Sequence, residues 1–334
     1  MKNAIVMAAG KGTRMHSDVP KVLHEVCGMP MVEMIVRQLK KAGAERIVTI
    51  TGYGHEDVEK AMAGQCEFAL QEPQLGTGHA VMQAKQLEGE SGITIVANGD
   101  CPCLKAETFA RLYEIGETAD MAVLTVVVDD ARSYGRIVRD SDGNVEKIVE
   151  FKDCSEEEKQ IHEVNTGIYV FNNAALFEGL KDLTDNNAQH EYYITDLIAI
   201  LKGKGRIVKA VVTEDEEEVQ GVNDNYELAK ANKTLQRRIN SYWMKSGVTI
   251  VDPDSTYIGE AVTFGKDVIV YPNTYLYGTC TIGNRVTIMP NTMLVNSTFT
   301  DNVTVKSGYI LNSTIKKEDT FGAFVTIESN HVVK

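Results

Sequence analysis

Apolar positions follow two different patterns along the chain, and the change falls near Gly247. Before it, short apolar runs alternate with longer amphipathic stretches. The runs predict strands at Ala4–Ala8, Arg46–Thr51, Glu67–Gln71, Thr94–Ala97, Met121–Val127 and Ile168–Phe171. Strands that alternate with helices indicate an α/β domain whose mostly parallel sheet is covered on both faces. Ligands of such sheets bind outside the carboxyl ends of the strands.

The amphipathic stretches have helical periodicity. Helices are predicted at Pro30–Ala42, Gly78–Leu87 and Ala106–Glu117. A longer helix is predicted at Asp224–Lys245, where leucine and isoleucine recur at a heptad-like spacing and Gly247 provides a C-terminal stop. We interpret this long helix as the connector between two domains.

After Gly247 the spacing of apolar residues becomes regular. One aliphatic or aromatic residue recurs at every sixth position: Ile258, Phe264, Val270, Leu276, Ile282, Ile288 and Leu294. The register then slips by one to Phe299, Val305 and Leu311, and it resumes at Phe321 and Ile327. A period of six fits neither a helix nor an isolated strand, and an antiparallel sandwich would not keep that phase. The pattern predicts a triangular parallel β-helix, although periodicity alone does not fix its handedness.

These patterns divide the chain into three parts. We expect an α/β domain over residues 1–225, a connecting helix over residues 226–247 and a short β-helix domain over residues 248–334. A chain of 334 residues is long for one core and suits two domains.

Composition excludes several classes of protein. A net charge of −13 argues against a nucleic-acid surface, which needs a basic stripe. No apolar run approaches the ~20 residues that a membrane span needs, and the N-terminus does not have the pattern of a secretory signal. The six cysteines show no disulfide framework, so we expect reduced thiols and a cytoplasmic location.

The strongest local signal is the run Ala8–Met15, which follows the first predicted strand and precedes Pro20-Lys21. Its glycines allow a tight turn that brings backbone N–H groups close to phosphates, and Lys11, Arg14 and Lys21 add cations. The run lacks the Gly-Lys-Ser/Thr of a Walker loop and the third glycine of a dinucleotide fingerprint. Taken alone, the run is also compatible with a plain strand–helix turn.

Three further residues have chemistry suited to a nucleotide and a metal. Gln71 is an amide that both donates and accepts, as a uracil edge requires, or it is a solvated amide at the end of a strand. Asp100 follows the strand Thr94–Ala97 and offers the oxygen that a hard cation prefers; a role as helix cap is weakened by its distance from Ala106. Asn223 is either a second oxygen ligand or a cap of the connector helix.

The order of the motifs carries a family resemblance. The motifs are Met7–Lys21, Gln71–Ala80, Asn98–Pro102, Tyr134–Arg136, Val149–Asp153, Glu163–Gly167 and Val219–Asn223. Together they resemble the sugar nucleotidyltransferases, and their spacing is similar to that of the bacterial N-acetylglucosamine-1-phosphate uridyltransferases along the whole chain. The resemblance implies a Rossmann-like nucleotidyltransferase domain followed by a short left-handed parallel β-helix of hexapeptide repeats.

The resemblance also implies residue roles. UTP would be bound by Ala8, Ala9, Gly10, Gly12, Thr13, Gln71, Gly76 and Thr77, and the sugar phosphate by Gly135, Glu150, Asn165 and Thr166. Asp100 and Asn223 would hold Mg²⁺. Our own hypothesis is that Arg14 and Lys21 act catalytically by neutralising the triphosphate. The products would be UDP-N-acetylglucosamine and pyrophosphate, formed from UTP and N-acetylglucosamine-1-phosphate in a homotrimer that binds neither nucleic acid nor membrane.

Other functions stay open at this point. The same chemistry could serve another sugar-1-phosphate, or dTTP in place of UTP. A regulatory or assembly subunit with the same two domains is a second alternative, and a bifunctional enzyme is a third. The chain resembles the family's β-helix only up to the region before its acetyltransferase residues, so we do not expect acetyltransferase activity.

Overall fold

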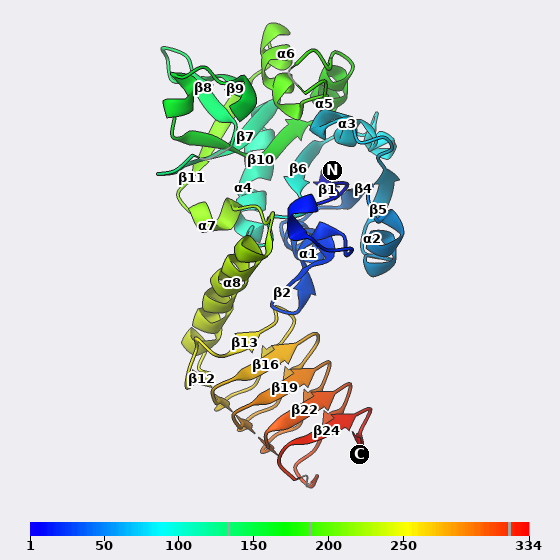
Figure 1. Cartoon of the computed structure of the whole chain (residues 1–334), viewed down its shortest axis with the longest axis vertical. Helices are drawn as coiled ribbons and strands as arrows, with labels where there is room; N and C mark the ends of the chain where they lie inside the picture. Colours follow the sequence, from blue (N-terminus) through cyan, green and yellow to red (C-terminus); the bar gives the residue numbers. More distant parts are fainter. Residues whose placement is uncertain (132–133, 188, 320–321, 334) are drawn as a thin grey trace. The chain divides into compact units, whose positions relative to one another are not determined.

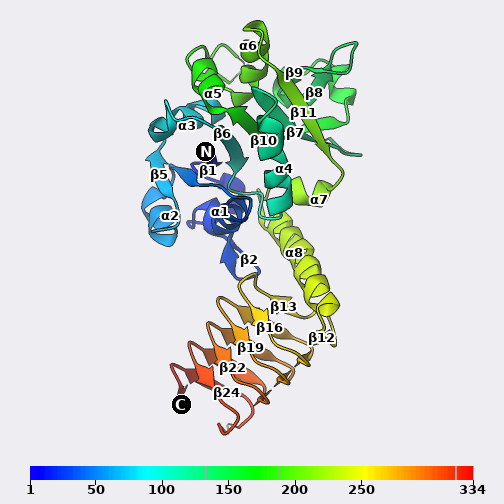
Figure 2. The same cartoon turned by 180° about the vertical axis from the view of Figure 1, so that it is seen from behind.

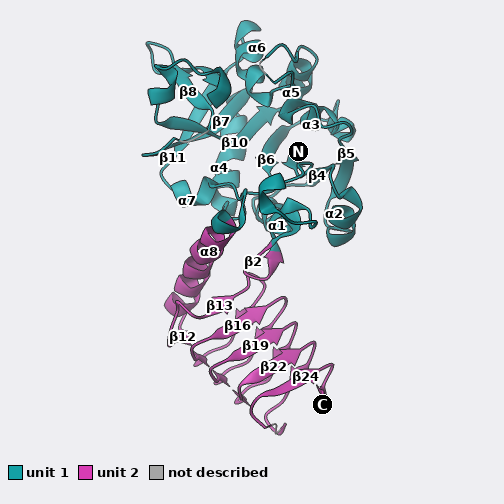
Figure 3. Ribbon diagram, in the orientation of Figure 1, with its two compact units in different colours: residues 1–24, 30–227 teal, residues 25–29, 228–334 magenta. Residues whose placement is uncertain are grey.

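The structure is a computed structural model that describes residues 1–131, 134–187, 189–319 and 322–333 (Figure 1). Phe321, one position of the hexapeptide pattern, lies outside the described residues. The chain forms two compact units, one of residues 1–24 and 30–227 and the other of residues 25–29 and 228–334 (Figure 3). No helix in the described ranges is both long and apolar enough to cross a membrane.

The first unit is built on one mixed sheet. Its strands lie in the order β11 (Val208–Thr213), β7 (Met121–Val127), β10 (Glu163–Asn172), β6 (Ile93–Asn98), β1 (Lys2–Met7), β4 (Arg46–Thr51) and β5 (Glu67–Leu70). Only β10 runs antiparallel to its neighbours β6 and β7 in this order; the other pairs are parallel. All six predicted strands are confirmed, and the predicted mostly parallel sheet is confirmed with them. The strand β11 was not predicted.

A hairpin and a bulge interrupt the regular ladder at one end of β10. The hairpin of β8 (Arg136–Arg139) and β9 (Val145–Val149) joins β10 where Val164 pairs with Arg136. Between Asn165 and Ile168 the register of β10 against β7 shifts, and Gly167 has φ = +75°. The bulge takes Thr166 and Gly167 out of the regular ladder, which is a common way to aim side chains beside a functional site.

Helices cover both faces of this sheet (Figure 1 and Figure 2). The helices of the first unit are α1 (Met31–Lys41), α2 (His55–Ala61), α3 (Thr77–Met82), α4 (Ala106–Gly116), α5 (Asn173–Leu180), α6 (Leu197–Gly203) and α7 (Glu216–Val219). Short 3-10 turns lie at Thr13–Met15, Lys21–Leu23, Lys85–Leu87, Phe151–Asp153, Glu158–Gln160 and Ile194–Asp196. One core cluster contains apolar residues of α1, α2 and α4, and the other contains those of α3, α5 and α6. Successive residues of β1 alternate between the two clusters, which confirms the predicted covering of both faces.

The second unit contains most of the connector helix and a parallel β-helix. The connector helix α8 (Asn225–Lys245) begins one residue later than predicted. After it, three ladders of short parallel strands form the three sides of the β-helix. One ladder consists of β12 (Thr249–Ile250), β15 (Ile269–Val270), β18 (Thr287–Ile288) and β21 (Thr304–Val305). Another consists of β14 (Thr263–Phe264), β17 (Thr281–Ile282), β20 (Thr298–Phe299) and β23 (Thr314–Ile315). The third consists of β13 (Tyr257–Ile258), β16 (Thr274–Tyr277), β19 (Thr292–Val295), β22 (Gly308–Leu311) and β24 (Val325–Glu328), with β25 (His331–Val333) added antiparallel.

The hexapeptide residues form the core of this β-helix. Nearly all of the predicted positions are buried, including Ile258, Leu276 and Leu294, each 0% exposed. The predicted β-helix is therefore confirmed, and its parallel ladders agree with the left-handed form of the fold class. The remaining segment of this unit, residues 25–29, contains β2 (Glu25–Val26) and the start of β3 (Met29–Pro30).

One position of the repeat was assigned wrongly. We expected Leu311 in the core, but Ile310 is the buried residue (3% exposed) and pairs with Leu294, whereas Leu311 is half-exposed. The reason lies at the corner that follows. Asn296 and Asn312 both have φ = +48°, and the Asn296 Nδ2 donates to Asn312 Oδ1 at 3.4 Å. Stacking these two corner residues fixes the register of the coil, so the core position falls two residues before each asparagine.

Candidate functional site

A polar cleft opens in the first unit at the carboxyl ends of β1, β5 and β6. About 320 Å³ of it is open to the centre of a water molecule. Its lining comprises Met7, Ala8, Ala9, Gly10, Lys21, Val22, Gln71, Gln74, Gly76, Thr77, Ala80, Asn98, Asp100 and Glu191. Most of the residues predicted to bind a nucleotide therefore share one cleft, at the edge of the sheet where α/β proteins bind ligands.

The glycine-containing loop after β1 forms one wall of this cleft. The Ala8 N–H donates to Ile50 O at 2.9 Å and the Tyr53 N–H donates to Ala9 O at 3.1 Å, which ties the start of the loop to the next strand. Gly12 has φ = +62°, and a Cβ there would lie 2.5 Å from Lys21 Cβ. Glycine is thus required at position 12 both for backbone conformation and for the close approach of Lys21. Thr13 follows directly and begins a 3-10 turn.

Four predicted residues meet in one charged cluster. The Lys21 ammonium forms an ion pair with Asp100 and donates to Asn223 Oδ1 at 3.3 Å. Arg14 Nη2 donates to the same oxygen of Asn223 at 2.9 Å. Two side-chain oxygens from distant parts of the chain therefore converge on a cation. Such a donor set fits a hard cation that takes one or two protein ligands and otherwise keeps water or phosphate oxygens.

The described residues contain no group of three or more His, Cys, Asp or Glu side chains arranged to hold a metal. A metal held by one carboxylate and one amide, as predicted for Asp100 and Asn223, would not form such a group. The arrangement therefore fits Mg²⁺ that is bound together with a phosphate ligand better than a metal held by protein alone.

The alternative roles of Asp100 and Asn223 as helix caps can now be assessed. At the start of α8 it is Asp224 whose Oδ1 accepts from the Glu227 N–H at 2.8 Å, and Glu227 Oε2 accepts from the Asn223 N–H at 2.8 Å. At the start of α4 the Lys105 N–H donates to Glu218 Oε1 at 3.0 Å. Neither helix uses the side chain of Asp100 or Asn223 as a cap, which leaves both oxygens directed at the cationic cluster.

Gln71 is held in one orientation by its surroundings. It is 5% exposed, and its Nε2 donates to Gly76 O at 2.9 Å and lies 3.3 Å from His79 Nδ1. Burial lowers the pKa of His79. Gln83 Nε2 lies 3.2 Å from the other ring nitrogen of His79. A neutral imidazole accepts at only one of its two nitrogens, so only one of these two amides can donate to the ring. The Gln71 amide NH₂ thus donates within the protein. The amide oxygen Oε1 is the atom that would accept a hydrogen bond from a ligand.

Gly76 and Thr77 bring a distant segment to the cleft. Gly76 has φ = +103°, and a Cβ there would lie 2.7 Å from Tyr192 O, so only glycine fits. The Ile194 N–H donates to Thr77 Oγ1 at 3.1 Å. These contacts place Glu191 in the cleft lining. Sequence reasoning missed Glu191, for which there was no local signal, and Gln74, which stands inside a recognised motif and donates to Ala9 O.

The four residues predicted to hold the sugar phosphate form a second group around the β10 bulge. The Asn165 N–H donates to Gly135 O at 2.9 Å, and a Cβ at Gly135 would lie 3.5 Å from Glu150 Oε2. Burial raises the pKa of Glu150, whose Oε1 accepts from Thr195 Oγ1 at 3.5 Å. Thr166 Oγ1 donates to Leu124 O at 2.7 Å. Gly135, Glu150 and Asn165 are therefore neighbours, while the hydroxyl of Thr166 is occupied by the sheet.

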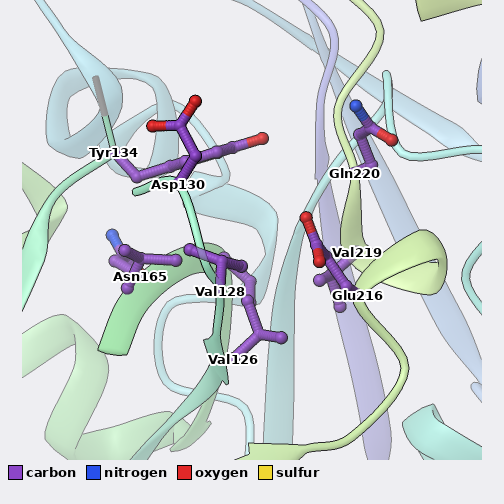
Figure 4. A pocket seen from close by; sticks show the side chains of 10 residues that line it. Val126, Val128, Asp130, Tyr134, Asn165, Glu216, Val219 and Gln220 are labelled. Atoms are coloured by element: carbon purple, nitrogen blue, oxygen red, sulfur yellow. The ribbon is translucent and has the colours of Figure 1, made fainter. Parts of the chain in front are cut away.

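Asn165 and Thr166 also line a small pocket between β7, β10 and α7 (Figure 4). The rest of its lining is Val126, Val128, Asp130, Tyr134, Val164, Glu216, Val219 and Gln220. In Figure 4 the side chains of Glu216, Val219 and Gln220 face those of Val128 and Asn165 across it. About 20 Å³ is open to the centre of a water molecule, which is room for roughly one water and not for a sugar. None of the other residues predicted to bind substrate lines it.

Comparison with known proteins places the chain in a family. Residues 3–248 match the family description "Nucleotidyl transferase". The bifunctional protein GlmU of Limosilactobacillus fermentum is 53% identical over 272 residues, which is 80% of this chain and 60% of that protein. The protein of the same name from Geobacillus thermodenitrificans is 51% identical over 272 residues, 80% of this chain and 59% of that protein.

A third relative, the bifunctional protein GlmU of Halalkalibacterium halodurans, is 47% identical over 324 residues, which is 96% of this chain and 71% of that protein. The chain thus spans about 60% of the length of the first two relatives. The match to the family covers the whole sheet and the cleft at its edge, with the glycine loop, Gln71, Asp100 and Asn223 inside it. This chain belongs to the nucleotidyl transferase family.

Proposed function

We propose that the chain is a magnesium-dependent uridyltransferase that forms UDP-N-acetylglucosamine and pyrophosphate from UTP and N-acetylglucosamine-1-phosphate. The observation that carries the proposal is a cleft lined by the start of the glycine loop, Gln71, Lys21 and Asp100, together with the hydrogen bond from the same Lys21 to Asn223. The name shared by the relatives, and the motif order that resembles bacterial uridyltransferases, support the choice of substrates.

The reaction is a nucleotidyl transfer in which the sugar-phosphate oxygen attacks the α-phosphorus of UTP and pyrophosphate leaves. No protein nucleophile is needed because the attacking group is already an anion, so the protein contributes positioning and charge neutralisation. Asp100 and Asn223 would hold Mg²⁺, which supplies charge neutralisation at phosphate oxygens when it is bound. Arg14 and Lys21 would neutralise the triphosphate, and the backbone of Ala8–Thr13 would hold it beside them.

On the sugar side, Gly135, Glu150, Asn165 and Thr166 would bind the second substrate. A carboxylate that accepts hydrogen bonds from hydroxyl groups suits an uncharged polyol, and the half-buried Glu150 beside Gly135 provides one. Because the hydroxyl of Thr166 already donates to Leu124 O, it would contact a substrate only as a hydrogen-bond acceptor.

The direct test is pyrophosphate release from UTP and N-acetylglucosamine-1-phosphate as a function of Mg²⁺ concentration. Glucose-1-phosphate, galactose-1-phosphate and dTTP in parallel reactions would identify another sugar or base preference. A regulatory subunit would release no pyrophosphate with any of them. The presence of Arg14, Lys21, Asp100 and Asn223 in one cluster supports the enzyme over that alternative.

For assembly and location we propose a homotrimer in the cytoplasm, with neither nucleic acid nor membrane as a partner. The trimer rests on the family resemblance of the β-helix.

Replacing Arg14 by alanine is expected to lower turnover roughly 100-fold, because one of the cations at the triphosphate is lost. Stability should hardly change, since Arg14 is exposed. Lys11→Ala is the matched control: Lys11 stands in the same loop, but its ammonium lies over the Tyr53 ring at 5.3 Å. The measurement is pyrophosphate release for both variants. Wild-type turnover in Arg14→Ala would move the catalytic role to Lys21 or the metal.

The Michaelis constant for the sugar phosphate is expected to rise as pH falls, because protonation removes the carboxylate acceptor of Glu150. Its pKa is raised by burial, so the rise should begin at a higher pH than for an ordinary glutamate. Below that pKa each further pH unit should raise the constant by up to about tenfold. The substrate phosphate itself titrates near pH ~6. Glu150→Gln keeps that titration, so the two profiles should differ by the contribution of Glu150, and identical profiles would contradict the role.

A further inference from the structure

A buried carboxylate joins the loop that carries Asn223 to the loop that carries Asp100. Glu218 in α7 is 2% exposed although it belongs to an acidic run. Its Oε1 accepts a hydrogen bond from the Lys105 N–H at 3.0 Å, and its Oε2 lies 3.4 Å from Lys105 Nζ. Lys105 follows Asp100 in one loop and Glu218 precedes Asn223 in the other.

Surface ion pairing alone does not account for this carboxylate. Asp215 already pairs with Lys105 at 2.5 Å from a more exposed position, with 37% of its side chain accessible. A buried charge costs free energy unless it is paired and hydrogen-bonded. Among the described residues, the backbone N–H and the ammonium of Lys105 provide this pairing for the Glu218 carboxylate. Unlike Asp215, which pairs with the Lys105 side chain, Glu218 also binds the Lys105 backbone N–H and so fixes the backbone at the start of α4.

Two further contacts join the same loops. The Val222 N–H donates to Asp100 O at 2.9 Å, and Cys101 Sγ lies 3.8 Å from Val219 O. Each of these contacts lies within a residue or two of Asp100 or Asn223. The two loops are therefore joined near Asp100, by the Val222 N–H, and again near Lys105, by the carboxylate of Glu218. Their separation therefore determines how far apart the two predicted metal ligands lie.

We infer that Glu218 is a positioning residue that sets the separation of the Asp100 and Asn223 oxygens and thereby the affinity for a divalent cation bound with UTP. The inference rests on the proposed function. Residues that orient metal ligands without touching the metal typically change metal affinity or activity by 10–100-fold when they are replaced. Removing Glu218 takes this acceptor away from the Lys105 N–H and leaves α7 joined to the Asp100 loop by fewer contacts.

The test compares Glu218→Ala, Glu218→Gln and the control Asp215→Asn. Binding of the Mn²⁺–UTP complex is followed by electron paramagnetic resonance without sugar phosphate, so that the readout does not depend on turnover. Glu218→Ala is expected to weaken binding roughly 10–100-fold. Glu218→Gln should weaken it less, because an amide oxygen can still accept from the Lys105 N–H. Asp215→Asn should bind like the wild type, since the exposed pair does not fix the backbone of Lys105.

Thermal unfolding of each variant separates positioning from stability. A folded Glu218→Ala variant with a lower melting temperature and wild-type affinity for Mn²⁺–UTP would overturn the inference. So would an Asp215→Asn variant weakened as much as Glu218→Gln, because the charge of Lys105 would then be what matters. If Glu218→Ala does not fold, Glu218→Gln decides: weaker binding supports the inference and wild-type binding overturns it. Failure of the proposed function is distinct, since the wild type itself would then not bind Mn²⁺–UTP.

Discussion

Replacing Asp100 by asparagine is expected to cut turnover roughly 10²–10³-fold while the protein keeps its stability. In the described structure, the side-chain groups that contact the Lys21 ammonium are the carboxylate of Asp100 and the amide oxygen of Asn223. The substitution replaces that carboxylate with a neutral amide. The asparagine oxygen can still accept from the Lys21 ammonium, and the Val222 N–H still donates to the backbone oxygen of residue 100. The loss should therefore be one of charge at the metal and not of packing.

Pyrophosphate release measured across a range of Mg²⁺ concentrations checks this expectation. The variant should need more Mg²⁺ for half-maximal activity, because one anionic ligand has become neutral. Asp182→Asn is a matched control, since Asp182 forms an exposed ion pair with Lys204 at 2.6 Å and neither residue lines the cleft. Unchanged magnesium dependence in Asp100→Asn would exclude the assigned role, whatever its turnover.

The position of Asp100 beside the cleft could be predicted from the sequence because it follows from the order of strands alone. Asp100 follows a buried apolar strand, and residues after parallel strands gather at one edge of a sheet. Asn223 was placed there only by the resemblance, since its position just before a long helix equally suggested a cap. In the structure the side chain that caps this helix is that of Asp224 and not that of Asn223.

What the sequence did not predict depends on contacts between distant segments. Glu191 reaches the cleft because the Tyr192 N–H donates to Leu75 O, a pairing without a local pattern. The buried state of Glu218 was hidden in an acidic run whose composition suggests a solvated face. In the β-helix, Ile310 and Leu311 are both aliphatic, so the six-residue period could not tell them apart without the stacked asparagine corners.

The edge strand β11 and the hairpin of β8 and β9 escaped prediction for a related reason. Val208–Thr213 is only partly buried, with a single buried residue at Val211, so its apolar pattern is weak. The hairpin carries charged side chains that pair across the surface, such as Arg139 with Glu163 at 2.6 Å. Strands stabilised by edge pairing and surface charge lack the continuous apolar run that identifies central strands.

Gln71 is expected to decide between pyrimidine bases. Its Nε2 is committed to Gly76 O, and the carbonyl there cannot donate, so the amide cannot turn over without losing this bond. The acceptor Oε1 that remains matches the N3–H of uracil and opposes the N3 acceptor of cytosine. A site built on such a hydrogen bond typically rejects the mismatched analogue by about 10⁴-fold or more.

We therefore expect the wild type to prefer UTP over CTP by roughly 10⁴-fold in kcat/KM, and Gln71→Ala to lose most of that preference by losing activity with UTP. Gln83→Ala is the matched control, because Gln83 contacts the same imidazole of His79 but does not line the cleft. It should keep the preference, since Gly76 O still fixes the orientation of Gln71. Pyrophosphate release with each nucleotide gives the ratio. If Gln71→Ala kept the wild-type ratio, the base would be read elsewhere in the cleft, and Gln74 would be the next amide to replace.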